Sequence, residues 1–191
     1  MVKKLNKVNS QEVEAYQKIL FWFFSYPNKE FSLSDIAKEL NISKNTASYI
    51  TNELCKEEFL KIQTIGRIWR ISCNKNHIYN YSKKISYNLM MVYESGIIEE
   101  IHKIIPNPKN IILFGSYRKG DDDENSDIDI AIEIIGNEEP KIHELGVISK
   151  FAYRKDVLVN LHIFSRNKID INLFSNIANG IVLEGFLEVR P

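Results

Sequence analysis

The stretch Leu113-Phe114-Gly115-Ser116-Tyr117-Arg118-Lys119-Gly120, followed by Asn125-Ser126-Asp127-Ile128-Asp129-Ile130-Ala131-Ile132, decides the fold of the C-terminal half. It predicts two short apolar strands, the first ending at Gly115-Ser116 and the second beginning with two aspartates. Because side chains alternate along a strand, the carboxylates of Asp127 and Asp129 emerge on the same face and can together hold a divalent cation.

The turn after the first strand has the composition of a phosphate site. Gly115 has no Cβ, so a triphosphate can approach the backbone closely, and Ser116 can donate its hydroxyl to a phosphate oxygen. A helix that begins near Tyr117 would direct free N–H groups at the same anion. Arg118 and Lys119 add positive charge nearby.

The spacing of these residues, a Gly-Ser pair and ten residues later Asp-x-Asp, resembles that of the polymerase-β-like nucleotidyltransferase superfamily in its minimal form. The resemblance implies a nucleoside triphosphate substrate and Mg²⁺ or Mn²⁺ as cofactor. It also implies that Asp127 and Asp129 are the catalytic, metal-binding residues, and that Gly115, Ser116, Arg118 and Lys119 bind the nucleotide.

The sequence departs from the superfamily pattern at the third acid, which active members supply from a later strand. The matching strand is 157–164, and its central polar residue is Asn160, a weaker magnesium ligand than a carboxylate. Asp156 and His162 have the same strand parity as Asn160. Asp156 is a candidate substitute, whereas His162 is expected to make a structural hydrogen bond, because imidazole is a poor magnesium ligand. The departure leaves catalysis an open question.

Simpler interpretations of the acidic run Asp121-Asp122-Asp123-Glu124-Asn125 compete with this one. The run can be a solvated loop. An EF-hand that begins at Asp121 fails, because its sixth residue is Ser126 instead of glycine and its twelfth is Ile132 instead of glutamate.

The rest of the C-terminal half predicts a small α/β domain with a mixed sheet over residues 106–191. We expect strands at 110–114, 128–135 and 157–164, helices at 141–154 and 170–177, and a short apolar tail at 181–186. Residues 77–105 are expected to form a linker helix between this domain and the N-terminal one.

Residues 1–76 predict three helices and a β-hairpin, which makes the whole chain α+β. The helices are expected within 13–24, at 34–40 with Ser34 as N-cap, and after Ser43; the hairpin strands 60–64 and 67–72 meet at Ile65-Gly66. This order resembles a winged helix-turn-helix domain and implies double-stranded DNA as a partner. The residues implied to contact DNA are Lys44, Asn45, Ser48, Tyr49 and Asn52 on the third helix, and Arg67 and Arg70 on the hairpin.

Charge is divided unevenly along a chain whose net charge is zero. Residues 1–75 hold 12 Lys and Arg against 8 Asp and Glu, and residues 76–191 hold 13 against 17. The basic part suits phosphate contact, although such an imbalance is also common in domains that bind no nucleic acid. The sequence has no apolar run long enough to predict a membrane span. It has no secretory signal either, so we expect a cytoplasmic protein. Cys55 and Cys73 are then expected to be free thiols.

Three functions remain open at this point. The first is a metal-dependent nucleotidyltransferase acting on an unknown acceptor, such as a protein hydroxyl. The second is a DNA-binding regulator or antitoxin-like module that binds a protein partner, with weak or no catalysis. The third is a scaffold that forms a homodimer through Ile85, Leu89 and Val92, a stripe that is more often intramolecular core.

Overall fold

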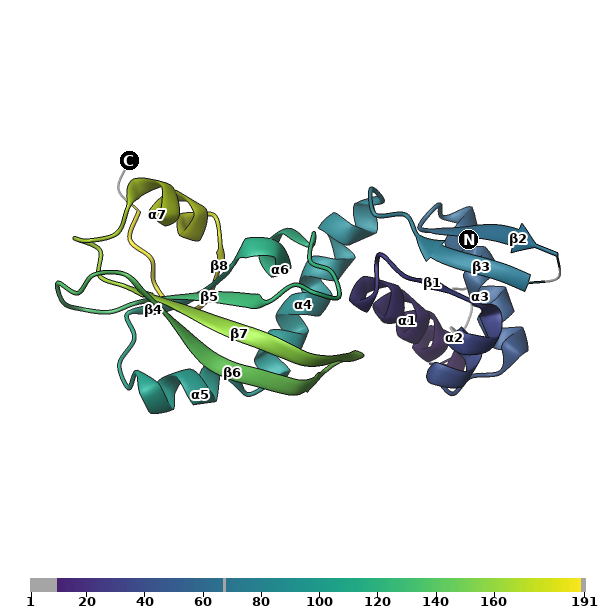
Figure 1. Cartoon of the computed structure of the whole chain (residues 1–191), viewed down its shortest axis with the longest axis horizontal. Helices are drawn as coiled ribbons and strands as arrows, with labels where there is room; N and C mark the ends of the chain where they lie inside the picture. Colours follow the sequence, from purple (N-terminus) through teal and green to yellow (C-terminus); the bar gives the residue numbers. More distant parts are fainter. Residues whose placement is uncertain (1–9, 67, 190–191) are drawn as a thin grey trace, which may run out of the picture. The chain divides into compact units, whose positions relative to one another are not determined.

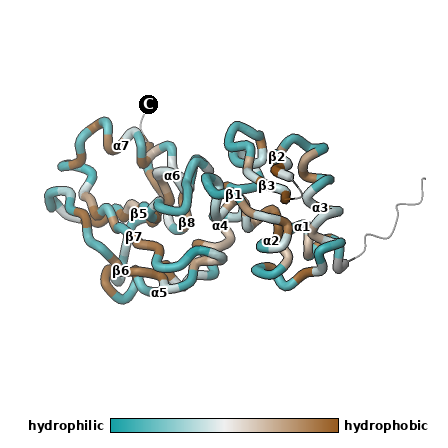
Figure 2. Tube along the Cα trace, turned by 45° about the vertical axis from the view of Figure 1, so that its right-hand side comes forward, coloured by the Kyte–Doolittle hydropathy of each residue, from teal (hydrophilic) through white to brown (hydrophobic). Residues whose placement is uncertain are grey.

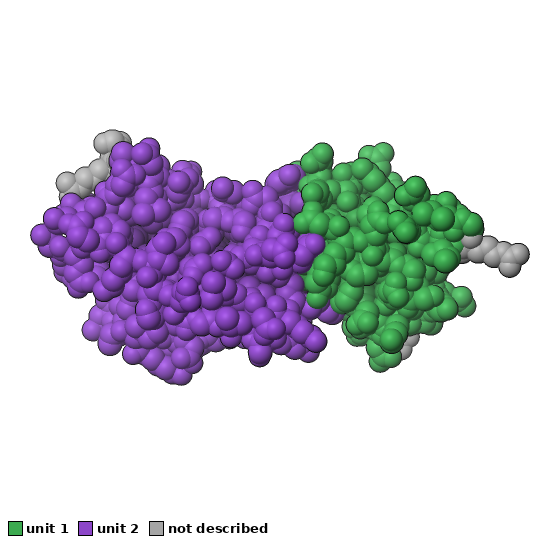
Figure 3. All heavy atoms as spheres, in the orientation of Figure 1, with its two compact units in different colours: residues 1–79 green, residues 80–191 purple. Residues whose placement is uncertain are grey.

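The computed structural model describes residues 10–66 and 68–189 and has the predicted α+β class. The chain divides into two compact units, residues 1–79 and residues 80–191, which Figure 3 colours separately. Each unit has its own sheet.

The N-terminal unit combines three helices with a three-stranded antiparallel sheet (Figure 1). Its elements are α1 (Ser10–Ser25), β1 (Glu30–Phe31), α2 (Leu33–Glu39), α3 (Lys44–Lys56), β2 (Leu60–Ile65) and β3 (Ile68–Cys73), with sheet order β1-β3-β2. Phe23 and Phe24 of α1 are fully buried, and Phe24 meets the Phe59 ring edge-on at 5.5 Å. Aromatic packing of this kind fixes α1 on the rest of the unit.

The N-caps of α3 and α2 are Ser43 and Ser32. Ser43 caps α3 as expected, because its Oγ accepts from the Thr46 N–H at 3.0 Å. The expected cap Ser34 is wrong: the cap of α2 is Ser32, which forms a reciprocal capping box with Asp35. A Ser-x-x-Asp pair satisfies two backbone N–H groups at once, whereas Ser34 could satisfy only one.

The C-terminal unit is built on a five-stranded mixed sheet. Its elements are α4 (Lys83–Glu94), α5 (Ile97–Ile104), β4 (Asn110–Phe114), α6 (Gly115–Lys119), β5 (Ile128–Glu133), β6 (Lys141–Phe151), β7 (Arg154–Phe164), α7 (Ile171–Ala178) and β8 (Ile181–Gly185). A 3₁₀ turn, η1 (Ile78–Tyr81), lies at the boundary of the units. The sheet order is β6-β7-β5-β4-β8, with β5 and β7 parallel and the other pairs antiparallel.

The two faces of this sheet bury different side chains. One face carries Ile128, Ile130 and Ile132 of β5 and packs on α4, α5 and α6. The other carries Ala131 and packs on α7, which lies across the sheet from α5 in Figure 1. In Figure 2 the strands carry hydrophobic stretches, and the loops at the ends of the sheet are mostly hydrophilic. Strand alternation therefore places Asp127 and Asp129 on the α7 face.

The helix expected at 141–154 is wrong, because this segment is the long edge strand β6 and the start of β7. Ile142, Leu145 and Ile148 recur every three residues, which mimics a helix. In the sheet, the register between β6 and β7 shifts between Glu144 and Gly146, and Gly146 has a φ of +138°. A bulge of this type changes strand parity, so the apolar spacing departs from strict alternation.

Residues 77–105 contain two helices, α4 and α5, instead of one linker helix, and both belong to the C-terminal unit. Val92 of the proposed dimer stripe is fully buried in the core beside Ile97 and Ile101, so it serves intramolecular packing. Within the described part of the chain, no helix is long and apolar enough to cross a membrane.

Candidate active site

The turn at Gly115 is adapted to a close neighbour. Gly115 adopts a left-handed backbone with a φ of +69°, and a Cβ there would lie 2.7 Å from Oδ2 of Asp129. Both the backbone conformation and the space therefore require glycine. As a result, the carboxylate of Asp129 lies against the backbone of the predicted phosphate turn.

The two aspartates lie at the start of β5, next to the end of β4. Asp129 pairs with Phe114 in the antiparallel ladder, which brings the carboxylates beside Gly115-Ser116. Asp127 is half-buried, and the Asp129 side chain is 30% exposed, so solvent and ligands can reach both. The structure thus brings together the two halves of the motif, which the sequence separates by ten residues.

Two side chains of β7 face the aspartates. The amide of Asn160 lies 3.4 Å from Oδ2 of Asp127, and Nε2 of His162 lies 3.1 Å from Oδ1 of Asp129. The His162 ring also meets Phe114 edge-on at 4.9 Å. The expected hydrogen bond of His162 is confirmed, and its partner is one of the two aspartates of the motif.

Among the described residues, Asp156 is not grouped with Asp127 and Asp129. It is exposed, and its φ of +54° departs from an extended strand, so the parity that relates it to Asn160 does not hold. Among the described residues, no three His, Cys, Asp or Glu side chains are grouped closely enough to hold a metal ion. The acidic part of the site is therefore the pair Asp127 and Asp129, with Asn160 beside it.

The residues present fit a divalent cation. Hard cations prefer carboxylate oxygens, and two half-exposed carboxylates share one face of the sheet. Of the described lysines and arginines, none forms an ion pair with either aspartate; the neighbouring groups are the Asn160 amide and the His162 imidazole. Asp127 and Asp129 would hold Mg²⁺ or Mn²⁺, with Asn160 as a further oxygen donor once its amide is turned.

The predicted nucleotide residues lie on α6, a helix of only five residues. Ser116 is in its first turn and is half-buried, whereas Arg118 and Lys119 are in its last turn. So short a helix adds little dipole, and a phosphate would depend on the Gly115 backbone and the Ser116 hydroxyl. Lys119 is exposed and extends the positive surface around the turn.

Sequence reasoning missed the buried polar residues behind the turn. Asn88 of α4 donates to the carbonyl of Tyr117 at 3.0 Å and to Asp122 at 2.7 Å. Lys84 forms an ion pair with Asp122 at 3.3 Å, so the acidic run is not a wholly solvated loop. Burial raises the pKa of Asp122 against the opposing effects of Lys84 and Asn88, and burial also raises the pKa of Tyr117. In the sequence, these residues are marked only by their polar side chains at positions of α4 that prove to be buried.

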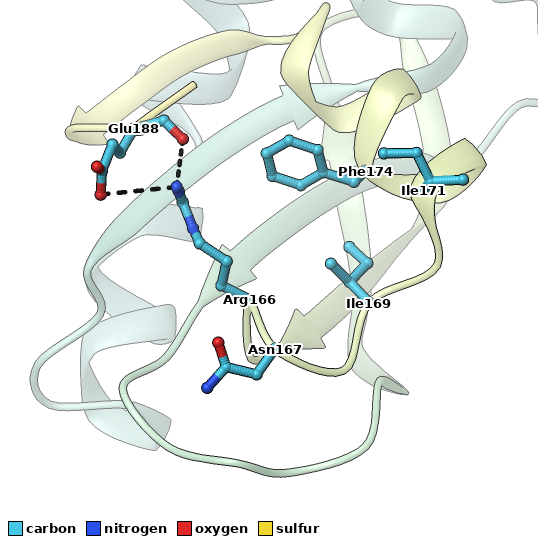
Figure 4. A pocket seen from close by; sticks show the side chains of 6 residues that line it. All are labelled: Arg166, Asn167, Ile169, Ile171, Phe174 and Glu188. Carbon is cyan, nitrogen blue, oxygen red and sulfur yellow. Dashed lines mark hydrogen bonds and ion pairs between the residues drawn. The ribbon is translucent and has the colours of Figure 1, made fainter. Parts of the chain in front are cut away.

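Two pockets flank α7. One, of about 330 Å³, lies next to the site and is lined by Pro140, Lys141, Ile142, His162, Ile163, Phe164, Leu173 and Ile177. The other, of about 410 Å³, is lined by Arg166, Asn167, Ile169, Ile171, Phe174 and Glu188 (Figure 4). In this second pocket the Arg166 guanidinium is held by Glu133 and Glu188 and lies over the Phe174 ring, 5.6 Å from its centroid. Its charge is therefore already engaged, and the first pocket is the one that adjoins the aspartates.

The candidate nucleic-acid surface in the N-terminal unit is the outer face of α3. Lys44, Asn45, Tyr49 and Asn52 are exposed and Ser48 is half-exposed, while Ala47, Ile50, Thr51 and Leu54 of the same helix are buried. Arg70 lies 3.4 Å from Glu30 in an exposed ion pair, which partly neutralises it. Arg67 lies outside the described residues.

Comparison with known proteins gives matches in the same part of the chain. Residues 94–177 match the family described as nucleotidyltransferase domain. A protein of Methanocaldococcus jannaschii named "Putative protein adenylyltransferase" is 35% identical over 60 residues, which cover 29% of this chain and 59% of that protein. The chain thus spans less than two thirds of this relative, and no solved structure matches. These findings support a nucleotidyltransferase domain in the C-terminal unit.

Proposed function

We propose that the C-terminal unit transfers a nucleotidyl group from a nucleoside triphosphate to a hydroxyl acceptor and depends on Mg²⁺ or Mn²⁺. The observation that carries this proposal is the close approach of Gly115 to Asp129, where a side chain as small as alanine would collide with the carboxylate. Close packing against a glycine is not by itself the mark of a site, since Gly120 meets a backbone carbonyl more closely. At Gly115 the close neighbour is a carboxylate of the motif, and a site that holds phosphate oxygens and a metal-binding carboxylate together needs this closeness.

The roles of the residues follow from their places in the sheet. Ser116 and the backbone of Gly115 would hold the β- and γ-phosphates, on the β4 side of the aspartates. Bound metal would neutralise phosphate charge and increase the electrophilicity of the α-phosphorus. The acceptor oxygen then bonds to the α-phosphorus, the bond to the bridging oxygen breaks, pyrophosphate leaves, and the hydroxyl proton is released.

In-line attack places the acceptor opposite the leaving pyrophosphate. The aspartates lie on β5, between β4, which carries the phosphate turn, and β7. An acceptor opposite the pyrophosphate therefore lies on the β7 side of the aspartates. The 330 Å³ pocket at His162 lies there, between β7 and α7, and its side chains are mainly apolar. A hydroxyl carried by an amino-acid side chain suits this pocket, in keeping with the name of the M. jannaschii relative.

A transfer assay tests this function. The protein is incubated with each of the four α-labelled ribonucleotides, Mg²⁺ or Mn²⁺, and protein or peptide acceptors with free hydroxyl side chains. Transfer is expected for the wild type, is lost in Asp127→Asn, and is kept in Asp121→Asn, which neutralises an exposed carboxylate on the nearby loop. Release of pyrophosphate with no metal dependence, or equal activity in Asp127→Asn, would count against the proposal.

Asn160 favours a second candidate function, a nucleotide-binding regulator without turnover. Asn160 occupies the place beside Asp127 where an acid would complete a metal shell, and an amide binds magnesium more weakly. In this alternative, the N-terminal unit binds double-stranded DNA through α3. The C-terminal unit binds nucleotide, and a protein partner or a second copy of the chain binds according to its nucleotide state.

A salt titration tests the DNA part of this alternative. Lys44 and Asn45 lie exposed in the first turn of α3, the end that a recognition helix directs into the major groove. Replacing Lys44 with alanine should weaken binding to the upstream DNA of the gene and reduce the salt slope by about one. The matched control is Lys56→Ala in the last turn of α3, which should leave the slope unchanged; equal slopes for both variants would remove α3 from the interface.

A further inference from the structure

A buried polar network lies behind the phosphate turn. Lys84 and Asn88, one turn apart on α4, are each 1% exposed, and the Asp122 side chain that they share is 4% exposed. Lys84 also donates to the Asp122 carbonyl. Buried charges are costly unless they are paired and hydrogen-bonded, so the whole group is held in one arrangement.

The network extends to the peptide that precedes Asp127. Arg154, at the start of β7 and 6% exposed, donates to the Tyr117 hydroxyl. The same guanidinium donates to the carbonyl of Ser126 at 2.6 Å and to that of Glu124 at 3.2 Å. Tyr117 lies on α6 directly after Ser116, so one set of contacts reaches both halves of the motif.

The same side of α6 is closely packed against the start of the C-terminal unit. At Gly120, which ends α6 with a φ of +79°, a Cβ would lie 1.9 Å from the carbonyl oxygen of Asn80. Asn80 lies three positions before Lys83, the first residue of α4. The helix α6 is thus fixed at its C-terminal end by the segment 80–88, and the direction of its first turn follows from that attachment.

We infer that Lys84 and Asn88 are positioning residues, which hold α6 through Asp122 and Tyr117 and so set Gly115-Ser116 against the aspartates for nucleotide binding. The inference rests on the proposed nucleotide site. None of these side chains needs to touch the ligand. Their effect is on the placement of the turn, and a displacement of about 1 Å in such a site reduces rates or affinities by up to about a hundredfold.

A second buried carboxylate in the same sheet provides the control. Glu133, at the opposite end of β5, is 2% exposed and accepts from Lys109 at 3.0 Å, Asn110 at 2.6 Å and Arg166 at 3.0 and 3.1 Å. It matches Asp122 in having a lysine and an asparagine partner. It differs in being remote along the strand from Gly115 and Asp127. Lys109→Met therefore tests loss of an ion pair without loss of placement.

The experiment measures the affinity of the full chain for a non-hydrolysable ATP analogue with Mg²⁺, by calorimetry, below the unfolding temperature of each variant. We expect Lys84→Met and Asn88→Ala to weaken binding by about tenfold or more, and Lys109→Met to bind as the wild type does. Affinity for Mn²⁺ alone should change less than affinity for the nucleotide, which a general loss of structure would not produce. If Lys84→Met does not fold, the comparison is made with Asn88→Ala alone.

Unchanged affinity in folded Lys84→Met and Asn88→Ala, or an equal loss in Lys109→Met, overturns the inference and leaves the proposed function standing. Absence of metal-dependent nucleotide binding in the wild type refutes the proposed function, and the positioning role falls with it.

Discussion

Replacing Asn160 with aspartate places a third carboxylate beside Asp127, and its effect on stability has a predictable sign. The amide of Asn160 lies 3.4 Å from Oδ2 of Asp127. Two unit charges at this distance repel by about 1 kcal/mol at the dielectric constant of water and by about 5 kcal/mol at an effective value of 20. Because both side chains are half-buried, we expect Asn160→Asp to lower the free energy of unfolding by about 1–3 kcal/mol without metal.

Magnesium should reverse this effect, because a third carboxylate strengthens the metal site. Binding to the folded state stabilises it by about 2.7 kcal/mol at a metal concentration of 100 times Kd. The variant should thus be less stable than the wild type in EDTA and gain more stability from added Mg²⁺.

Urea unfolding with and without Mg²⁺ measures both differences, and the transfer assay shows whether the acid increases turnover. Asn125→Asp is the control, since it adds the same charge on the exposed acidic loop. An Asn160→Asp variant that equals the wild type in EDTA and responds no more strongly to Mg²⁺ would show that Asn160 does not lie in the metal site.

Three further predictions follow from the local geometry. Gly115→Ala should lower stability by about 1–2 kcal/mol through its left-handed backbone alone and also reduce nucleotide binding, because its Cβ displaces the Asp129 carboxylate; intact binding in calorimetry would contradict this. Ser43→Ala removes the α3 cap and should cost about 1 kcal/mol in urea unfolding, without effect on nucleotide binding. Burial acts to raise the pKa of Glu133, but hydrogen bonds from Arg166, Lys109 and Asn110 together outweigh it and hold this pKa below its usual 4.5. The stability that this carboxylate contributes is therefore present above about pH 4.5 and is lost as pH falls through the lower folded pKa, and Glu133→Gln should flatten that part of an acid-unfolding curve.

The site motif was predictable because its residues are close in the sequence and their chemistry is specific. The strand 110–114 has the predicted bounds, and the pairing of Phe114 with Asp129 brings the glycine turn to the carboxylates. Strand parity alone placed both aspartates on one face. A short apolar segment that ends at a glycine is typical of a strand followed by a turn.

What the sequence could not predict depends on long-range pairing. The segment 141–151 has helical apolar spacing, and only its pairing with β7 and the bulge before Gly146 make it a strand. Local spacing cannot report a bulge, because the shift in parity is set by the partner strand.

The buried network was hidden for a related reason. Lys84 and Asn88 belong to a segment expected to form a linker, and a lysine in a helix is usually solvated. Their partner Asp122 lies in an acidic run that resembles a surface loop. A charge pair between two residues 38 positions apart, such as Lys84 and Asp122, has no local sequence signature.

The central claim is that Asp127 and Asp129 form a metal-dependent nucleotide site with the turn at Gly115. The most direct test is calorimetric titration of a non-hydrolysable ATP analogue into the wild type, the double variant Asp127→Asn/Asp129→Asn, and Asp121→Asn, with Mg²⁺ and with EDTA. We predict binding to the wild type and to Asp121→Asn only with Mg²⁺, and none to the double variant. Binding that persists in the double variant, or absence of Mg²⁺-dependent binding in the wild type with analogues of all four nucleotides, would contradict the claim.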